Sequence, residues 1–354
     1  MKKLPHLSFA LLSVAFVLTC LLPFHSSPSS AVPPPAPDAV MLNGAGASFP
    51  YPIYAKWFSD YNKLHSDIQI NYQSIGSGGG IRQLLSGTVD FGASDAPMND
   101  EQLGQAKTKI LHFPTVLGAV VPIYNIPGVS QELNFTPDML VDIYLGKITK
   151  WNDAEIAKPN KGVDLPAQDI VVVHRSDGSG TSYVWTDYLS KVSTEWQSKV
   201  GRNTSVNWPV GLGGKGNEGV AGLVKQTPGA IGYVELIYAV QNQIPYGGVR
   251  NAAGAFVKAE LAGVTAAAAG FAKTMPEDFR ISITNAPGKA AYPICSFTYL
   301  LIPTKIEDAN KKQVIKNFLT WMLNDGQKAA EPLSYARLPK EVVTKELKQI
   351  SQIE

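Results

Sequence analysis

The sequence is poor in groups on which whole classes of protein depend. It has only two cysteines, Cys20 and Cys295, among 354 residues, which excludes a disulfide scaffold and a multi-cysteine zinc site. Only 17% of its residues are charged and the formal net charge is +2, whereas an average protein has about 25% charged residues. Composition alone therefore excludes a strongly basic nucleic-acid-binding protein, and an anion site would have to be local.

The arrangements that hydrolytic enzymes use are also missing. No Gly-x-Ser-x-Gly motif surrounds Ser77, Ser94 or Ser179, and residues 213–216 match only a fragment of a P-loop because a glycine follows Lys215. The five histidines have no metal-ligand spacing: His6, His25, His65, His112 and His174. A phosphatase or esterase needs a nucleophile with a base, or metal ions. The sequence thus predicts a protein that is not an enzyme, with no catalytic residues, no metal and no other cofactor.

Apolar residues are plentiful enough for a large core. Hydrophobic residues make up 45% of the chain, and its length suggests two domains at about 150 residues each. Periodicity predicts strands at 68–72, 89–93, 116–123, 170–173 and 294–302, and helices at 53–64, 81–85, 181–189, 219–225, 260–269 and 314–323. Alternating strands and helices indicate an α/β fold in which helices cover mostly parallel sheets.

The first residues have the pattern of a secretory signal peptide. Two lysines precede an almost wholly apolar stretch at 7–24, whereas a membrane anchor would need about 20 apolar residues and this stretch is broken by Pro23. We expect residues 1–31 to be removed on export to the periplasm, which leaves a proline-rich tail at 32–41. The residues before Cys20 only weakly resemble a lipoprotein signal, so a lipid-anchored form is the less favoured alternative.

Four short segments combine glycine with hydroxyl residues, most of them just before a predicted helix: 44–50, 76–80, 94–97 and 175–181. Backbone N–H groups at a helix start have no partner within the helix, and the helix dipole adds partial positive charge, so such ends bind anions readily. Glycine lets the backbone approach an anion closely, and hydroxyls add donors. The alternative, that these hydroxyls are plain helix caps, stays open for Ser48, Ser77, Ser179 and Thr181.

One cation accompanies these segments. Arg175 follows the predicted strand at 170–173, at the strand edge where ligands bind in open α/β sheets. A guanidinium can grip two oxygens of an oxyanion at once. Asp177, two residues further on, would fix the plane of the guanidinium; a simple salt bridge between the two residues is the alternative.

Asp95 is unusual in this setting because a carboxylate should repel an anion. It follows the predicted strand at 89–93 and Ser94. Such a residue is useful only if the ligand carries a proton, and phosphate keeps at least one proton at neutral pH whereas sulfate keeps none. With its reference pKa of about 3.9, Asp95 would be ionised at neutral pH. It would then accept that proton in a hydrogen bond and would repel sulfate. The alternative is an ordinary helix cap.

Read together, these segments closely resemble one family, the periplasmic phosphate-binding proteins of the phosphate-specific ABC transporter, of the PstS type. The resemblance runs from about Gly44 to about Leu338, is weakest between 241 and 288, and rests on these segments: 44–50, 76–80, 90–97, 143–148, 175–181 and 209–217. It implies a two-lobed periplasmic binding protein of type II, an α/β fold with a mixed, mostly parallel sheet in each lobe and two crossings between lobes. Lobe one would comprise 42–117 and 292–354, and lobe two 118–291.

The resemblance also implies the roles of individual residues. The ligand would be inorganic phosphate, contacted by Ser48, Phe49 through its backbone, Ser77, Asp95, Arg175, Ser179, Gly180 and Thr181, with Asp177 holding Arg175. Many relatives have serine at the position of Gly78. A glycine there still has the backbone N–H. The implied partners are the permease and ATPase subunits of a phosphate ABC transporter, with the protein itself a monomer that binds no nucleic acid. A receptor for another oxyanion, such as sulfate or molybdate, and a secreted phosphohydrolase are the competing hypotheses.

Overall fold

The computed structural model describes residues 39–271 and 274–354. The expected signal peptide, Cys20 and most of the expected proline-rich tail lie outside these residues, and the first strand, β1, begins at Val40, within the last residues predicted for the tail. No helix in the described ranges is both long and apolar enough to cross a membrane.

Eight strands form the main sheet, in the order β2-β1-β3-β11-β4-β8-β6-β7. Their bounds are β1 Val40–Gly46, β2 Ile68–Ser74, β3 Phe91–Ser94, β4 Ile110–Asn125, β6 Val171–Arg175, β7 Leu212–Gly214, β8 Ala230–Glu235 and β11 Cys295–Pro303. The pairs β1–β2, β1–β3, β6–β7 and β6–β8 are parallel, whereas β11 and β4 pair in the antiparallel sense with each other and with their outer neighbours. The predicted α/β architecture with a mixed sheet is confirmed.

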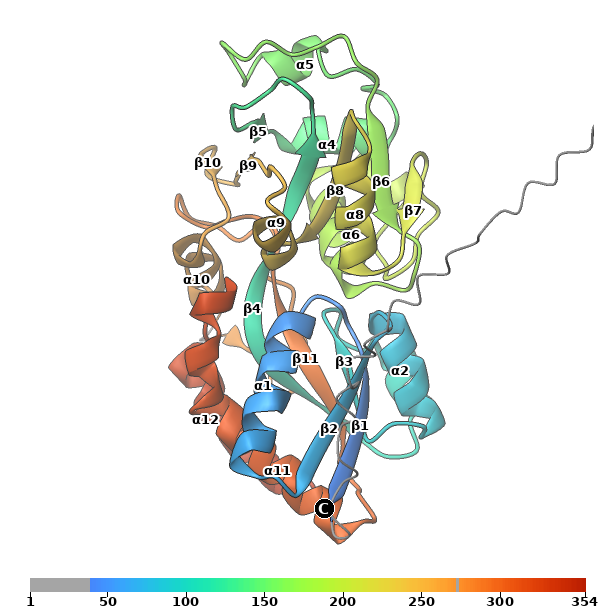
Figure 1. Cartoon of the computed structure of the whole chain (residues 1–354), viewed down its shortest axis with the longest axis vertical. Helices are drawn as coiled ribbons and strands as arrows, with labels where there is room; N and C mark the ends of the chain where they lie inside the picture. Colours follow the sequence, from blue (N-terminus) through green and yellow to red (C-terminus); the bar gives the residue numbers. More distant parts are fainter. Residues whose placement is uncertain (1–38, 272–273) are drawn as a thin grey trace, which may run out of the picture. The chain divides into compact units, whose positions relative to one another are not determined.

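The long strand β4 divides this sheet into two sections. It pairs with β11 as far as Ala119 and with β8 from Val120 onward. We call β2-β1-β3-β11 with the first part of β4 the first section, and the remainder of β4 with β8-β6-β7 the second section. Figure 1 shows β4 running from one section into the other, beside the chain that leads into β11. These two connections correspond to the two expected crossings, while the predicted lobe boundaries at 117/118 and 291/292 stay predictions.

Helices cover both sections. The helices are α1 Tyr51–Leu64, α2 Ser77–Ser86, α3 Asp100–Gly104, α4 Pro137–Tyr144, α5 Ala154–Ala157, α6 Gly180–Val192, α7 Thr194–Lys199, α8 Gly216–Gln226, α9 Leu236–Asn242, α10 Leu261–Ala269, α11 Ala309–Leu323 and α12 Lys340–Gln349, with short 3-10 turns at Gly326–Ala329, Glu331–Leu333 and Ile350–Gln352. In the first section α1 and α2 pack on β1–β3, and in the second α6 and α8 pack on β8 (Figure 1). All six predicted helices are present.

The part of the chain between 241 and 288, which gave few sequence signals, holds the predicted helix α10 and also a small sheet. This sheet has the order β10-β9-β5, with strands β5 Asn134–Phe135, β9 Gly248–Arg250 and β10 Phe256–Val257. Strands of two or three residues are too short to leave a readable alternation of apolar and polar side chains.

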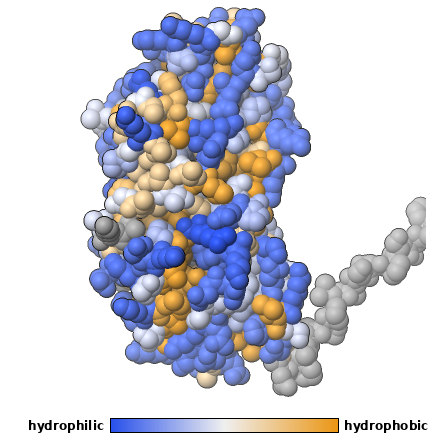
Figure 2. Space-filling view, turned by 90° about the vertical axis from the view of Figure 1, so that its left-hand side faces the viewer, coloured by the Kyte–Doolittle hydropathy of each residue, from blue (hydrophilic) through white to orange (hydrophobic). Residues whose placement is uncertain are grey.

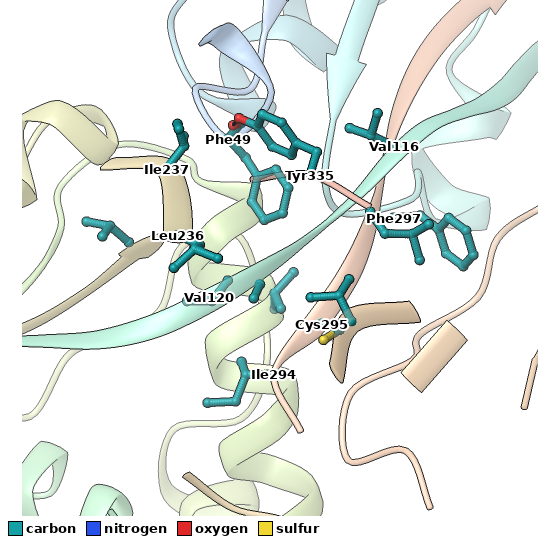
Figure 3. Close-up of a cluster of buried hydrophobic side chains, with 14 of the residues drawn as sticks. Phe49, Val116, Val120, Leu236, Ile237, Ile294, Cys295, Phe297 and Tyr335 are labelled. Carbon is teal, nitrogen blue, oxygen red and sulfur yellow. Dashed lines mark hydrogen bonds between the residues drawn. The ribbon is translucent and has the colours of Figure 1, made fainter. Parts of the chain in front are cut away.

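Apolar side chains fill the region where the two sections meet. Figure 3 shows Phe49 and Tyr335 over β4, close to Val120 and Leu236. Phe49, in the turn after β1, thus packs its apolar side chain on β4, the strand that joins the two sections. The surface is more polar, and Figure 2 shows hydrophilic residues over most of one face with smaller apolar patches among them.

Candidate binding site

The site is assembled at the carboxyl ends of strands, as expected for an open α/β sheet. In the first section, β1 leads into the turn before α1, β2 into the start of α2, and β3 into Asp95. In the second section, β6 ends at Arg175 and is followed by α6. A backbone hydrogen bond joins the sections here, with the N–H of Gly78 donating to the carbonyl of Gly178 at 2.8 Å. The N–H of Asp95 donates to the Ser77 hydroxyl and Gly80 lies against Gly46, so all four glycine-hydroxyl segments meet in one place.

Asp95 is almost fully buried, with 1% of its surface exposed. The hydroxyl of Thr298, on β11, donates to Oδ1 at 2.8 Å, and the N–H of Asp95 donates to the Ser77 hydroxyl at 3.3 Å. The other oxygen, Oδ2, has no hydrogen-bond partner within the described part of the chain. Burial raises the pKa of Asp95 to about 7, although the Thr298 bond and the charge of Arg175 act in the opposite direction. The site thus contains a carboxyl group with one oxygen committed and one free to accept a proton.

The alternative role for Asp95 is wrong. The next helix, α3, begins at Asp100, and its cap is Asn99, whose side chain accepts from the N–H of Gln102. Asp95 lies four residues before this cap. Its side chain therefore has no part in starting a helix.

Arg175 is also buried, with 3% of its surface exposed. Its Nε and Nη2 donate to the two carboxylate oxygens of Asp177 at 2.8 and 2.5 Å, and its Nη1 donates to the Thr181 hydroxyl at 3.4 Å. Burial opposes the charged form of Asp177, but the bonds from Arg175 and from the Gly216 N–H lower the pKa of Asp177 below its usual value. Both sequence interpretations hold together, because the salt bridge exists and it fixes the guanidinium plane.

The start of α6 lies directly against Asp95. A Cβ added to Gly180 would lie 2.7 Å from Asp95 Cβ and would overlap with Oδ2 and with the Ser77 hydroxyl. Ser179 caps this helix, because its hydroxyl accepts from the N–H of Ser182 at 3.0 Å. Among the described residues the N–H groups of Gly180 and Thr181 have no such partner, as expected for a first helical turn. Gly180, whose backbone N–H is unpaired, therefore adjoins the unpaired oxygen of Asp95, and the unpaired N–H of Thr181 comes next in the chain.

The remaining hydroxyls are not caps. Helix α1 begins at Tyr51 after Pro50, without a side-chain cap, and the residue before α2 is Gly76. The Ser48 hydroxyl instead accepts two bonds from Asn217, from its N–H at 3.1 Å and from Nδ2 at 2.9 Å. Ser77 is buried beside Asp95. The capping interpretation is therefore right for Ser179 and wrong for Ser48, for Ser77 and for Thr181, which lies inside α6.

Phe49 serves the site through its packing. Its ring occupies the space over Gly118, where an added Cβ would come within 2.6 Å of the ring. The hydroxyl of Tyr335 donates to the Phe49 carbonyl at 2.6 Å (Figure 3), and that of Tyr238 donates to the Ser48 carbonyl at 2.6 Å. The backbone between Ser48 and Phe49 is thus held from both sides.

Two residues with polar side chains at the site were missed from the sequence. Asn217 is in α8, just after the glycine-rich stretch that fails as a P-loop, and Thr298 is inside a strand with mostly apolar neighbours. The four glycines around Lys215 were a usable signal for Asn217, since they open a helix. No sequence pattern around Thr298 indicates that it belongs to a binding site.

The arrangement can surround a small anion that carries a proton. It offers backbone N–H groups, hydroxyls and one guanidinium as donors, and the free Oδ2 of Asp95 as acceptor. Residues 39–271 and 274–354 contain no group of His, Cys, Asp and Glu side chains suited to a metal ion. Cys295 is buried, and burial raises the pKa of its thiol, so it is unreactive.

Comparison with known sequences finds a matching family model and relatives that cover most of the chain. A family model for a PBP superfamily domain matches residues 31–326. The protein called phosphate-binding protein PstS from Xylella fastidiosa is 46% identical over 318 residues, which cover 89% of this chain and 86% of the relative. Its namesake from Pasteurella multocida is 47% identical over 309 residues, covering 87% and 89%.

Solved structures show the same fold. A high-affinity periplasmic phosphate-binding protein bound with phosphate, PfluDING, has a TM-score of 0.69 at 21% identity and covers 87% of this chain and 93% of its own. A putative phosphate ABC transporter substrate-binding protein with bound phosphate, from Clostridium perfringens, has a TM-score of 0.63 at 18% identity and covers 85% and 100%. Identities this low support the fold and not the details of a site.

Proposed function

The chain belongs to the PBP superfamily and, within it, to the phosphate-binding proteins named PstS, and we propose that it binds inorganic phosphate between the two sections of the sheet and delivers it to a phosphate ABC transporter for import. It binds its ligand and does not convert it. Its partners are then the permease and ATPase subunits of the transporter, and it works as a monomer in the periplasm.

The observation that carries the choice of phosphate is the unpaired Oδ2 of Asp95. This oxygen and the Ser77 hydroxyl, which can donate, both lie against Gly180. An anion bound there must offer a proton to this oxygen while its other oxygens accept. Phosphate at neutral pH does so, and sulfate has no proton to offer. Above about pH 7, where Asp95 is ionised, its carboxylate would face sulfate as an unpaired charge next to another, which is specificity by repulsion.

The other contacts follow from the donors present. We propose that Arg175, held by Asp177, supplies the only full positive charge. The hydroxyls of Ser48, Ser77, Ser179 and Thr181 and the N–H groups of Phe49, Gly180 and Thr181 complete the contacts. Phosphate has five heavy atoms, and a ceiling of about −1.5 kcal/mol per atom gives about −7.5 kcal/mol, which corresponds to low micromolar affinity.

Calorimetric titration tests this function. The wild-type protein, freed of bound anion, is titrated with phosphate, sulfate and molybdate at pH 8. We expect saturable phosphate binding with a low micromolar Kd, and no sulfate binding at millimolar concentration. Preference for sulfate or molybdate would identify a receptor for another oxyanion and contradict the proposal. Phosphate uptake by cells whose own binding protein has been deleted then tests delivery to the transporter, with Arg175→Ala as the matched negative control.

A further inference from the structure

Asn217 connects three elements at the centre of the site without having been assigned to it. It is fully buried near the start of α8. Its Oδ1 accepts the N–H of Glu235 at 2.9 Å, and its Nδ2 donates to the hydroxyl oxygens of Ser48 at 2.9 Å and Thr181 at 3.0 Å. A backbone N–H can only donate, so the oxygen of the Asn217 amide must face Glu235. The amide nitrogen must then face the two hydroxyls.

This orientation decides what the two hydroxyls can do. The Ser48 oxygen accepts a second bond from the Asn217 N–H at 3.1 Å, and the Thr181 oxygen accepts a second bond from Arg175 Nη1 at 3.4 Å. A hydroxyl oxygen has two lone pairs and one hydrogen. With both lone pairs facing donors, neither Ser48 nor Thr181 can accept a further bond, and each can only donate its hydrogen.

We propose that Asn217 is a positioning residue that makes the hydroxyls of Ser48 and Thr181 obligatory donors to the bound anion. The inference rests on the proposed function, since it assumes that these two hydroxyls contact phosphate. A hydroxyl group that rotates freely in the empty site loses this freedom when the anion binds. The hydroxyls of Ser48 and Thr181 are already oriented by the buried amide of Asn217. The site thereby favours ligand atoms that accept and disfavours any that donate, with Asp95 as the one exception.

A second role for the same contacts has to be separated from this one. Ser48 belongs to the first section and Asn217 to the second, so their bond could simply hold the sections together. Thr181 distinguishes the two roles, because α6 and α8 both pack on the second section. If Asn217 only joins the sections, its effect on affinity is independent of the Thr181 hydroxyl. If it orients hydroxyls, its effect depends on them.

A mutant cycle in phosphate affinity provides the test. Asn217→Ala, Thr181→Val and Ser48→Ala are titrated with phosphate by calorimetry, singly and combined, with Gln226→Ala at the exposed end of α8 as the control. Loss of one charge-assisted hydrogen bond is worth about tenfold to a hundredfold in affinity. We expect Asn217→Ala to weaken binding about tenfold or more in the wild-type background, and clearly less when Thr181→Val is present. In the Ser48→Ala/Thr181→Val background it should change the affinity by less than about twofold.

Additive effects would overturn the proposal: an equal loss from Asn217→Ala with and without the Thr181 hydroxyl leaves Asn217 as a structural contact only. Unchanged affinity in Asn217→Ala alone would overturn it as well. Thermal unfolding of each phosphate-free variant checks the fold, and Asn217→Ser, which keeps a polar group but is too short to reach both hydroxyls, repeats the cycle if the alanine variant unfolds. Wild-type protein that does not bind phosphate at all would contradict the proposed function itself, which is a distinct result from additive variants of a binding-competent protein.

Discussion

Gly180, at the start of α6, lies so close to Asp95 that a side chain of even one carbon would collide with the Asp95 carboxyl. The two residues come from different sections of the sheet and are 85 positions apart in the sequence (180 − 95). Their approach places the start of α6, with its two unpaired backbone N–H groups, beside Asp95 Oδ2, a carboxyl oxygen that has no partner in the described ranges. The specificity that we propose depends on this contact.

Gly180→Ala should therefore weaken phosphate binding by more than about a hundredfold. The added methyl group would overlap with Asp95 Oδ2 and Ser77 Oγ, so the sections could approach only by distorting the site. Gly222→Ala, inside α8, is the matched control because nothing lies within 4 Å of its added Cβ. It should bind phosphate normally and be slightly more stable, since alanine is favoured over glycine in a helix by about 0.5–1 kcal/mol. Normal affinity of Gly180→Ala in calorimetry would show that this contact is not part of the bound state.

The residues around this contact could be predicted from the sequence only in part. Periodicity placed β6 and α6 correctly, and with them Arg175 at a strand end. Local pattern could not separate Ser179, which caps its helix, from Ser48, which accepts from a residue 169 positions away. Both residues belong to short segments that combine glycine with hydroxyl residues. What differs is the long-range partner, which no short motif records.

Long-range pairing also explains the residues that were missed. Thr298 donates to Asp95 across 203 positions, from a strand whose composition indicates only burial. Strand β1 was overlooked because Asn and Gly interrupt its apolar residues, and its place between β2 and β3 is fixed by parallel pairing. The assignment of the site residues came from the resemblance to a family. Reasoning from the residues themselves led to the hypothesis that the ligand is an anion that carries a proton and that Asp95 accepts this proton.

Asp95→Asn should admit sulfate, because the neutral amide removes the buried negative charge and offers an N–H to an oxygen that has no proton. The wild-type protein should also begin to bind sulfate as the pH falls below about 7, the pKa to which burial raises Asp95, since the protonated carboxyl can donate. We expect up to about tenfold tighter sulfate binding per pH unit in the wild type and a flat profile in the variant, measured by calorimetry from pH 5 to 8. Asp169→Asn, with a carboxylate that is 79% exposed, controls for the loss of one charge. Sulfate affinity that is independent of pH in the wild type would exclude Asp95 as the source of selectivity.

Burial of Asp95 should also make the phosphate-free protein less stable at high pH. Burial raises its pKa to about 7 in the folded protein from the usual value of 3.8. The favourable contribution of the protonated form is therefore complete below about pH 4 and is lost as the pH rises through 7. The buried carboxyl of Glu235, whose pKa burial also raises, acts in the same direction. We therefore compare Asp95→Asn with the wild type at each pH, and expect the Tm difference in favour of the variant to be larger at pH 8 than at pH 5. A constant difference would mean that Asp95 does not titrate between these values.

Arg175 should be irreplaceable even by another cation. Its guanidinium donates to both oxygens of Asp177 and through Nη1 to Thr181, and only a planar group with several donors can hold such contacts while presenting its charge to an anion. We expect Arg175→Ala to weaken phosphate binding by more than tenfold, and Arg175→Lys to recover little of that loss. Asp177→Asn keeps the positive charge but loses the anchoring carboxylate, so its loss should be intermediate. Lys150→Ala, which removes an exposed cation paired with Asp169, should leave the affinity unchanged. If Arg175→Lys binds as tightly as the wild type, charge alone is sufficient, and the geometry imposed by Asp177 has no part in recognition.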